Sequence, residues 1–502
     1  MSFATIFSRA RVGIDAPLVT IEVHISNGLP AFQIVGLAET SVREARDRVR
    51  SALINSQFKF PQTRITVNLA PADLPKEGGR FDLPIALGIL AATGQIPANT
   101  LNQYEFYGEL GLKGDLRSII GEIPSALACA KSRRVAVLPR SNAQNAAIIG
   151  VEHILPCDTL LQVFHHLSGQ RPLPGLADCS PLSPCIEEQL DLKDVIGQHA
   201  AKRALEIAAA GQHNLVFLGP PGTGKSMLAQ RLLGILPEMT DDEALETSAI
   251  HSVSGKQFDA SRWRRRPFRQ PHHTASGVAL VGGGSVPKPG EISLAHNGVL
   301  FLDELPEFDR KVLDVLREPL ETGQVSISRA AQQADFPAQF QLVAALNPSP
   351  TGHHNDGRAS SDQVIRYLNK LSGPLLDRID LQIDVPLLPK GALNQKDEGE
   401  PSESVRQRVI AARQLMTSRA QKPNAQLSNS ELKLHCRLSE EDQAFLENTI
   451  YKLKMSIRAY HKILKVARTI ADLNQSEQIQ RAHLAEALSY RAMDRLLASL
   501  AN

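Results

Sequence analysis

The alternation of hydrophobic and polar positions predicts an α/β domain in the first third of the chain. Apolar and polar residues alternate over 18–25 and 64–68, as in half-buried strands, while the apolar spacing over 40–53 is that of an amphipathic helix. A second, more apolar helix is predicted over 82–93. We therefore predict one compact α/β domain over residues 1–168.

A different pattern follows, in which short, wholly apolar runs are separated by helical stretches. The runs cover residues 215–218, 299–302 and 342–346. Buried strands that alternate with helices are typical of a mostly parallel sheet covered on both faces. We predict this α/β core over residues 191–388.

The C-terminal region, residues 405–502, has helical periodicity and no clear strand pattern, which predicts a small all-α domain. Two stretches without periodicity separate the three domains. Residues 169–190 are rich in Pro, Ser and Gly, and residues 389–404 are polar. Both are predicted to be linkers, the second a flexible one.

Composition restricts the partners and the compartment. Among 502 residues, 55 basic and 53 acidic side chains give a net charge of +2, so any site for nucleic acid must be local. Five cysteines are few for 502 residues, and an odd number cannot all pair, which argues against a disulfide framework and for a reducing compartment. The first residues lack a signal-peptide core, and no apolar run approaches the roughly 20 residues that cross a bilayer. We expect a cytoplasmic protein without a membrane partner.

A phosphate-binding loop follows the first apolar run of the core. The sequence GPPGTGKS matches the pattern GxxxxGKS and lies between a predicted strand and a predicted helix over 227–236, the context that this motif requires. Its glycines let backbone N–H groups surround phosphates, Lys225 can reach the β- and γ-phosphates, and Ser226 can bind Mg²⁺. The residues predicted to bind ATP are Gly219, Pro220, Pro221, Gly222, Thr223, Gly224, Lys225, Ser226 and Met227.

Two carboxylates and an amide end the next two apolar runs. Asp303 is predicted to hold Mg²⁺ through water, and Glu304 to polarise the water that attacks ATP. Asn347 can hold that water or the γ-phosphate, with a simple Asn-Pro turn as the alternative. Together with Lys225, these residues predict Mg²⁺-dependent ATP hydrolysis.

Three residues outside these motifs are further candidates. Gln198 precedes the first helix of the core, where the backbone could line an adenine pocket. Arg378, in LLDRID, is a candidate arginine finger that reaches the γ-phosphate of a neighbouring subunit. Arg458, which precedes an amphipathic run in the C-terminal region, is a candidate sensor of ATP. Solvated surface arginines are the alternative for both.

These motifs together resemble the magnesium-chelatase-like AAA+ ATPases, and specifically the YifB/ComM competence-protein family. The resemblance covers essentially the whole chain and rests on GPPGTGKS, VLFLDE, Asn347, SGPLLDRID, SIRAYHKILKVARTIADL and RPFRQPHHTASGVALVGGG. It implies an AAA+ core with a helical lid, in a hexameric DNA helicase that drives branch migration. That activity would serve the integration of single-stranded DNA in natural transformation and homologous recombination. The implied cofactors are ATP and Mg²⁺, and the implied partners are single-stranded and branched DNA and further copies of the chain.

The N-terminal domain resembles the Lon-protease type of domain. The stretches VNLAPADLPKEGGRFDLPIAL and YGELGLKGDLRSIIGE carry this resemblance. Lon-type peptidases need a serine nucleophile and a lysine base, but Arg80 stands where the serine is expected, and no matching lysine follows Gly121. Neither group of the covalent mechanism is present. We predict a Lon-protease/S5-like α/β scaffold without peptidase activity, and leave open whether it touches DNA.

No zinc site is expected. Many relatives carry NPCPCG after the sensor asparagine, whereas this chain has NPSPTG, and hydroxyl groups do not replace soft thiolate ligands. His353 and His354 are interpreted as polar loop residues. Cys179 and Cys185 lie in the first linker, where a metal-binding pair is the less favoured alternative.

Two segments are candidates for DNA contact. Arginines surround Trp263 and Phe268, and the resemblance implies an inserted loop here that faces the ring pore. Arginine pairs with phosphates and aromatic rings stack on bases, although a solvated charge run around one buried Trp is the alternative. The second segment, 323–329, alternates like a hairpin strand, and an ordinary edge hairpin is its alternative. The predicted DNA contacts are Arg262, Arg264, Arg265, Arg266, Arg269 and Arg329.

Two other functions stay open at this point: a motor for metal insertion into a tetrapyrrole, and a protein-remodelling ATPase. The Lon-like domain argues against the first, because chelatase motor subunits usually lack it. The missing nucleophile and base argue against peptidase activity in the second. Stimulation of ATP hydrolysis by DNA, by unfolded protein or by neither would distinguish the three functions.

Overall fold

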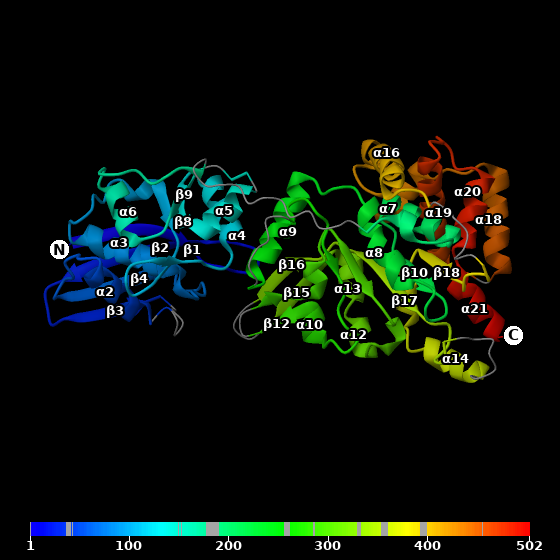
Figure 1. The fold of residues 1–502 in the computed structure, drawn as a ribbon, viewed down its shortest axis with the longest axis horizontal. Helices are drawn as coiled ribbons and strands as arrows, with labels where there is room; N and C mark the ends of the chain where they lie inside the picture. The colour runs from blue at the N-terminus through cyan, green and yellow to red at the C-terminus, as the bar shows by residue number, and fades with distance from the viewer. Residues whose placement is uncertain are drawn as a thin grey trace.

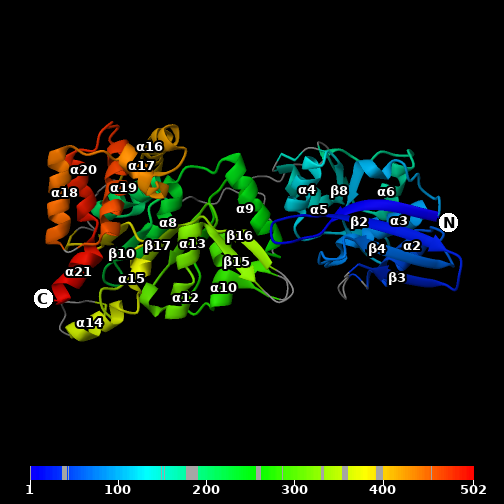
Figure 2. The same cartoon turned by 180° about the vertical axis from the view of Figure 1, so that it is seen from behind.

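The chain forms three parts that follow one another along the longest axis of the molecule (Figure 1). The N-terminal domain and the C-terminal helices lie at opposite ends, with the core between them, and the view from behind shows the same order (Figure 2). The computed structural model describes residues 2–36, 42, 44–148, 150–151, 153–176, 190–255, 262–284, 287–328, 333–352, 360–391, 399–453 and 455–501.

The N-terminal domain contains three sheets and a set of covering helices. The largest sheet has the order β1-β2-β4-β3, a parallel sheet has the order β5-β8-β9, and β6 pairs antiparallel with β7. Its strands are β1 (Ser2–Arg9), β2 (Leu18–Ser26), β3 (Ala31–Val35), β4 (Arg64–Ala70), β5 (Tyr104–Phe106), β6 (Glu109–Leu110), β7 (Leu116–Arg117), β8 (Val135–Pro139) and β9 (Ile154–Cys157). Its helices are α2 (Ala45–Asn55), α3 (Asp82–Ala92), α4 (Glu122–Lys131), α5 (Arg140–Ile148) and α6 (Leu160–Leu167).

The two predicted strands and the two predicted helices of this domain are present. Strands β2 and β4 pair antiparallel, and their inward residues, among them Ile21 and Val67, are fully buried. Helix α3 is buried along its whole length, which explains its nearly unbroken apolar sequence. Helix α2 begins at Ala45, and residue 42 is also helical. Residues 37–41 and 43 lie outside the part of the chain that the structure describes, so the predicted start at residue 40 stays a prediction.

The core is a five-stranded sheet with the order β11-β14-β17-β10-β18, in which every neighbouring pair is parallel. These strands are β10 (Leu215–Leu218), β11 (Phe268–Arg269), β14 (Val299–Leu302), β17 (Gln341–Leu346) and β18 (Leu381–Asp384). Two antiparallel hairpins accompany the sheet: β12 (Gly282–Gly283) with β13 (Lys288–Pro289), and β15 (Gln324–Ser328) with β16 (Gln333–Pro337). The helices are α7 (His199–Gly211), α8 (Lys225–Ile235), α9 (Asp241–Val253), α10 (Gly277–Val281), α11 (Glu291–Leu294), α12 (Arg310–Asp314), α13 (Arg317–Thr322), α14 (Ser361–Leu368) and α15 (Gly373–Leu376).

Both faces of the sheet are covered, as its apolar strands require. Leu215 and Phe217 pack on one face, in a cluster that continues into the C-terminal helices. Val216 and Leu218 pack on the other face with the β15–β16 hairpin, where Phe336 is fully buried. This arrangement confirms the predicted α/β fold with a mostly parallel sheet.

The described residues of the C-terminal part form helices and their connections, without a strand. Its helices are α16 (Ser402–Ala420), α17 (Asn429–His435), α18 (Glu440–Lys452), α19 (Ile457–Leu473), α20 (Arg481–Ser489) and α21 (Ala492–Ala501). Helix α16 begins inside the linker predicted over 389–404. The Ser402 hydroxyl accepts a hydrogen bond from the Leu192 N–H at 2.7 Å, and the Ser402 N–H donates to Asp191 at 2.9 Å. These bonds fix the start of the helix against the core, which the polar sequence did not indicate.

Among the described residues, the N-terminal domain touches the core at α9 and at the β15–β16 hairpin. The Gly121 N–H, just before α4, donates to the Ser252 carbonyl of α9 at 3.1 Å, and Ala249 is buried against α4. The turn that carries Gly13 lies on strand β16, where a Cβ at Gly13 would be 3.4 Å from the Cβ of Ala334. Figures 1 and 2 both show α9 and the β15–β16 hairpin on the side of the core that faces this domain.

Within the described residues, no helix is long and apolar enough to cross a membrane.

Candidate nucleotide-binding site

The phosphate-binding loop connects the end of β10 to the start of α8. Gly219 has room only for a hydrogen, because a Cβ there would lie 2.2 Å from the Val385 carbonyl oxygen at the end of the neighbouring strand. Gly222 and Gly224 have φ angles of +78° and +88°, which favour glycine. The loop therefore needs three of its glycines for steric or conformational reasons, and it turns its backbone towards the N-terminus of α8.

Lys225 folds back over this loop. Its Nζ donates to the carbonyls of Gly219 at 2.6 Å and Pro220 at 2.8 Å, and to Oδ1 of Asn347 at 3.1 Å. Burial lowers the pKa of Lys225, although Asp303 and Glu304 act in the opposite direction. The ammonium group is thus held over the loop by neutral acceptors that phosphate oxygens can replace.

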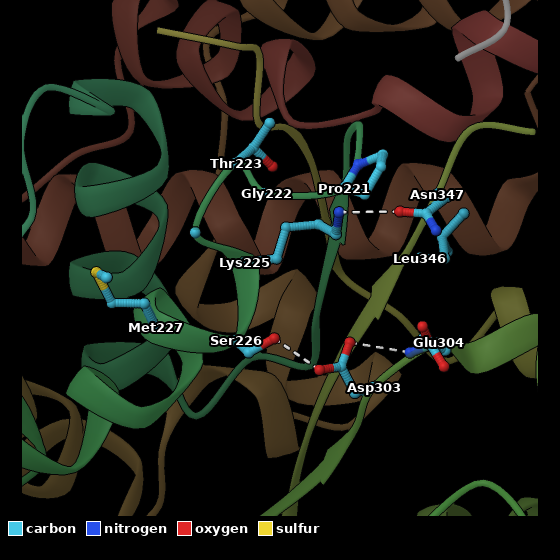
Figure 3. Close-up of a pocket in the computed structure, with 11 residues that line it drawn as sticks. Pro221, Gly222, Thr223, Lys225, Ser226, Met227, Asp303, Glu304, Leu346 and Asn347 are labelled. Atoms are coloured by element: carbon cyan, nitrogen blue, oxygen red, sulfur yellow. Dashed lines mark hydrogen bonds between the residues drawn. The ribbon is translucent and has the colours of Figure 1, made fainter. Parts of the chain in front are cut away.

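Ser226 and Asp303 form the pair of oxygen ligands that Mg²⁺ prefers. The Ser226 hydroxyl donates to Oδ2 of Asp303 at 2.6 Å, and the Glu304 N–H donates to Oδ1 of the same carboxylate at 3.0 Å (Figure 3). Because the strands β10 and β14 both run to this edge of the sheet, residues 77 positions apart meet here. The donor set fits a magnesium ion bound together with nucleotide phosphates.

Most of the residues predicted to bind or hydrolyse ATP line one pocket. Asn347 enters it from the end of β17, beside Lys225 (Figure 3). Leu346, which the sequence interpretation assigned only to a strand core, also lines it. The lining residues are Pro221, Gly222, Thr223, Gly224, Lys225, Ser226, Met227, Asp303, Glu304, Leu346 and Asn347.

Five residues predicted for the nucleotide site do not line this pocket: Gly219, Pro220, Gln198, Arg378 and Arg458. The carbonyls of Gly219 and Pro220 instead accept hydrogen bonds from Lys225. The Gln198 side chain donates to the Pro386 carbonyl at 2.8 Å. Arg378 is paired with Glu321, and Arg458 lies 3.2 Å from Asp377, with two thirds of its side chain exposed. Arg378 and Arg458 thus contact the core of their own chain, and their functions as finger and sensor stay predictions.

Some arginines of the arginine-rich segment are exposed, and others are bound to partners within the core. Arg266 donates to the carbonyls of Pro237 and Asn297, both at 2.7 Å, and pairs with Glu243 at 2.9 Å. Arg269 forms a bidentate pair with Glu291 at 2.6 and 2.7 Å.

These internal partners compete with DNA for Arg266 and Arg269, and give both a structural function that the charge pattern did not predict. Arg262, Arg264 and Arg265 are exposed, and Arg264 also pairs with Asp241. Exposure makes these three the stronger candidates for DNA contact.

Several predicted residues fall outside the described part of the chain. They are Arg329 between β15 and β16 in the sequence, Cys179 and Cys185 in the first predicted linker, and His353 and His354 after Asn347. Within the part that is described, no group of three or more His, Cys, Asp or Glu side chains could hold a metal ion. The expectation of no zinc stays a prediction.

Arg80, at the expected position of a peptidase serine, is a buried structural residue. Its guanidinium donates to the Arg9 carbonyl at 3.1 Å and to the Ile120 carbonyl, and one nitrogen lies 3.5 Å from the Ser125 hydroxyl. Burial lowers the pKa of Arg80 to about 10, so the group remains charged at neutral pH. The Ser125 hydroxyl is itself bound to the Gly121 carbonyl at 2.9 Å. A guanidinium that is held in this way supplies neither a nucleophile nor a base.

His273 is a neighbour of the site that the sequence interpretation missed. Its Nδ1 lies 3.5 Å from Oε2 of Glu304. It belongs to the PHH sequence at the end of β11, and the parallel pairing of β11 with β14 brings it to Glu304. The adjacent residues His272 and His273, which follow β11, were the feature of the sequence that could have indicated this contact.

Each of the three parts of the chain matches a protein family described as magnesium chelatase. The family described as magnesium chelatase, subunit ChlI, matches residues 191–393. Its C-terminal part matches residues 399–491, and subunit ChlI of Mg-chelatase matches residues 21–142.

Two relatives that align with the whole chain are more similar to it in sequence than a magnesium-chelatase subunit is. The chain is 58% identical to the competence protein ComM of Haemophilus influenzae, covering 100% of both chains. It is 53% identical to YifB of Escherichia coli, covering 100% of this chain and 99% of that protein. The magnesium-chelatase 67 kDa subunit of Chlorobaculum parvum is 28% identical over 160 residues, which is 31% of this chain and 23% of that subunit.

Proposed function

The chain belongs to the ComM/YifB family of magnesium-chelatase-like AAA+ ATPases, and on that premise we propose that it is an ATP-driven DNA translocase. In this proposal a homo-hexamer promotes branch migration when single-stranded DNA is integrated during natural transformation and homologous recombination. The observation that carries the proposal is the full-length identity of 58% to a competence protein.

The arrangement of the pocket supports ATP hydrolysis as the energy source. Lys225 exchanges its carbonyl partners for phosphate oxygens, and the loop N–H groups bind the remaining phosphate charge. Ser226 and Asp303 would hold Mg²⁺, which would supply charge neutralisation at the phosphates. Glu304 orients and polarises the attacking water, and Asn347 is close enough to Lys225 to share the γ-phosphate or that water.

DNA contact is proposed for the exposed arginines Arg262, Arg264 and Arg265 and for the β15–β16 hairpin. Contacts from arginine to phosphates give affinity without sequence preference, as a translocase requires. Helix α13 leads directly into β15 through Gly323, and Arg378 contacts Glu321 on that helix. A change at a subunit interface that moves Arg378 would thus reach the base of the hairpin.

A chelatase-type motor is the second candidate, since the matching families are named after that enzyme. The chelatase relative, however, aligns with only 31% of this chain, whereas ComM aligns with all of it. Measuring ATP hydrolysis with single-stranded DNA, with an unfolded protein and with neither separates DNA translocation from the other two functions.

The decisive test is migration of a four-way DNA junction by the purified full-length chain. We expect migration with ATP and Mg²⁺, and none with a non-hydrolysable analogue. Glu304→Gln should bind ATP but neither hydrolyse it nor move the junction, because an amide does not activate water. Glu307→Gln is the matched control, since Glu307 lies three residues further on and does not line the pocket. Hydrolysis by Glu304→Gln at the parent rate, or no migration by the parent chain, would reject the proposal.

A further inference from the structure

We propose that the outer face of the four-stranded sheet in the N-terminal domain binds single-stranded DNA, with a base stacked on Phe3 and the backbone held by Arg64. This inference rests on the proposed function and deepens it, because it gives the DNA substrate a second binding site outside the core.

The sheet β1-β2-β4-β3 has one buried face and one outer face, as the alternation along its strands requires. Ile6, Val23 and Val67 point to the buried face and are fully buried, and helix α3 packs on β1 and β2 there. Phe3 occupies an alternate position of β1 and therefore lies on the outer face, where it is 58% exposed. A large aromatic side chain thus remains open to solvent on a face that no residue of the apolar core occupies.

A row of side chains crosses the four strands from Phe3. The strand register places Phe3 opposite His24 of β2. His24 is in turn opposite Thr66 of β4, which is paired with Gln33 of β3. The Arg64 guanidinium ends this row, because it donates to Oε1 of Gln33 at 3.3 Å. The row thus begins with an exposed ring and ends with a cation.

The charge of the outer face is compatible with a polyanion. Glu22 is the only acidic residue in the sequences of the four strands. Its carboxylate accepts a hydrogen bond from the Asn68 amide at 2.8 Å, so it has a partner on the same face. Arg64, in contrast, is exposed and is bound only to a neutral amide in this row.

Further cationic side chains lie at the β1 edge of the sheet. Phe7 is on the same face as Phe3, four positions further along the strand, and the Arg134 guanidinium lies 4.1 Å from the centre of its ring. Lys131 and Arg133 shortly precede Arg134 in the sequence, and both are exposed. The outer face therefore has cations at both of its edges.

Single-stranded DNA is the occupant that this combination fits. Unpaired bases of any sequence stack on exposed aromatic rings, and arginines contact the phosphates between them. A duplex keeps its base planes covered, so it could meet only the cations. A protein partner would need a more apolar centre than one exposed phenylalanine among hydroxyl and amide groups.

The test measures binding of the full-length chain to a mixed-sequence single-stranded oligonucleotide and to the corresponding duplex. Fluorescence anisotropy gives both affinities at several salt concentrations, with Mg²⁺ and a non-hydrolysable ATP analogue present, and sedimentation velocity gives the oligomeric state. The variants are Phe3→Ala, Phe3→Tyr and Arg64→Ala. Leu161→Ala is the control, because Leu161 is also an exposed apolar residue of this domain but lies on α6, which packs beside the parallel sheet at β9.

We expect Phe3→Ala to bind the single strand about fivefold more weakly, the lower end of what stacking of one base contributes, with duplex affinity unchanged. Phe3→Tyr should restore the affinity, since it keeps the ring. Arg64→Ala should reduce the log–log salt slope for the single strand by about 0.7, which corresponds to one phosphate contact. Leu161→Ala should behave as the parent.

Three results would overturn the inference. The first is a single-strand affinity in Phe3→Ala equal to that of the parent. The second is an equal loss of single-strand and duplex affinity, which a damaged fold would produce. The third is a changed oligomeric state in Phe3→Ala with normal single-strand affinity, which would make this face a contact between copies of the chain.

Failure of the proposed function is distinguishable from failure of this site. If the parent does not migrate a DNA junction but Phe3→Ala loses affinity for the single strand alone, the proposed function fails and the site stands. If the parent migrates the junction and Phe3→Ala binds the single strand normally, the proposed function stands and the site is rejected. A parent chain that binds no single-stranded DNA rejects both.

Discussion

The guanidinium of Arg378 is paired with the carboxylate of Glu321, 57 residues earlier in the same chain. A second nitrogen donates to the Pro374 carbonyl, and only 15% of the Arg378 side chain is exposed. Arg378 therefore has partners within its own subunit, and action on a neighbouring subunit requires it to exchange Glu321 for a phosphate.

Mixed rings test that exchange. Arg378→Ala subunits keep Glu304, and Glu304→Gln subunits keep Arg378, so a ring containing both has some interfaces with both groups intact. We expect each variant alone to be inactive and the mixture to regain part of the ATPase activity, measured by phosphate release. Verified mixed rings without any rescue would contradict action between subunits.

Removing the internal partner tests the same residue from the other side. Glu321→Gln should keep or raise ATPase activity, because it releases Arg378 without removing it. Glu318→Gln, on an exposed position of the same helix, should have no effect. A loss of activity in Glu321→Gln that equals the loss in Arg378→Ala would show that the pair itself, and not the freed arginine, is needed.

Gly219→Ala should disrupt the phosphate-binding loop. The added Cβ would lie 2.2 Å from the Val385 carbonyl, so either the loop or β18 must shift. Overpacking of this kind costs about 1–3 kcal/mol, and we expect weaker ATP binding together with a lower melting temperature. Gly277→Ala is the control, since a Cβ there meets no atom within 4 Å. Equal ATP affinity in Gly219→Ala and the parent would contradict the loop geometry.

His251 should make the core less stable as the pH falls. Burial lowers its pKa to about 4, and the positive charges of Arg269 and Arg262 act in the same direction. Since an unfolded histidine titrates near 6.5, the unfolded chain binds more protons between about pH 6.5 and 4, and the free energy of unfolding decreases there by up to about 3 kcal/mol. His251→Gln should flatten this dependence in urea unfolding measured from pH 7 to 4.5. Parallel pH profiles for the two proteins would contradict the assignment.

Substitutions in the arginine-rich segment should affect either DNA binding or fold stability, depending on which arginine is replaced. Arg264→Ala with Arg265→Ala should weaken single-stranded DNA binding and reduce the log–log salt slope by roughly 1.4, about 0.7 for each phosphate contact, without changing ATP hydrolysis in the absence of DNA. Replacing Lys433 of α17 and Arg437, which follows that helix, is the control, since both are exposed in the C-terminal part of the chain. An unchanged slope in the double variant would place DNA elsewhere.

Arg266→Ala should act differently, by destabilising the fold. Its guanidinium bonds to three carbonyls and one carboxylate, and only 11% of the side chain is exposed. Loss of hydrogen bonds from a charged group costs about 1.5–3 kcal/mol, which a shift of the melting temperature should reveal. Normal stability with weakened DNA binding would instead support the original prediction for this residue.

The nucleotide pocket was predictable because its functional side chains lie in the loops that follow strands β10, β14 and β17. Lys225, Asp303 and Asn347 each follow an apolar run, and parallel strands bring the ends of such runs to one edge of the sheet. The sequence order of the motifs is then sufficient to place the three side chains together.

The partners of the arginines were not predictable in the same way. Arg266 meets Glu243 and Asn297, which are 23 and 31 residues away, and nothing in the local pattern indicates either contact. The contact of His273 with Glu304 depends on a two-residue strand and its register, and so short a strand has no periodicity to detect. Tertiary packing, rather than local sequence, decided both.

The buried guanidinium of Arg80 also determines which evolutionary routes remain open to the N-terminal domain. It joins β1, the turn before α4 and α4 itself, so a serine at position 80 would remove a cross-link and leave a hole before any nucleophile became useful. A lysine base would still be missing, so this substitution would weaken the fold without supplying a working nucleophile. The side chain at position 80 thus contributes to the rigidity of the domain and not to chemistry on a peptide bond.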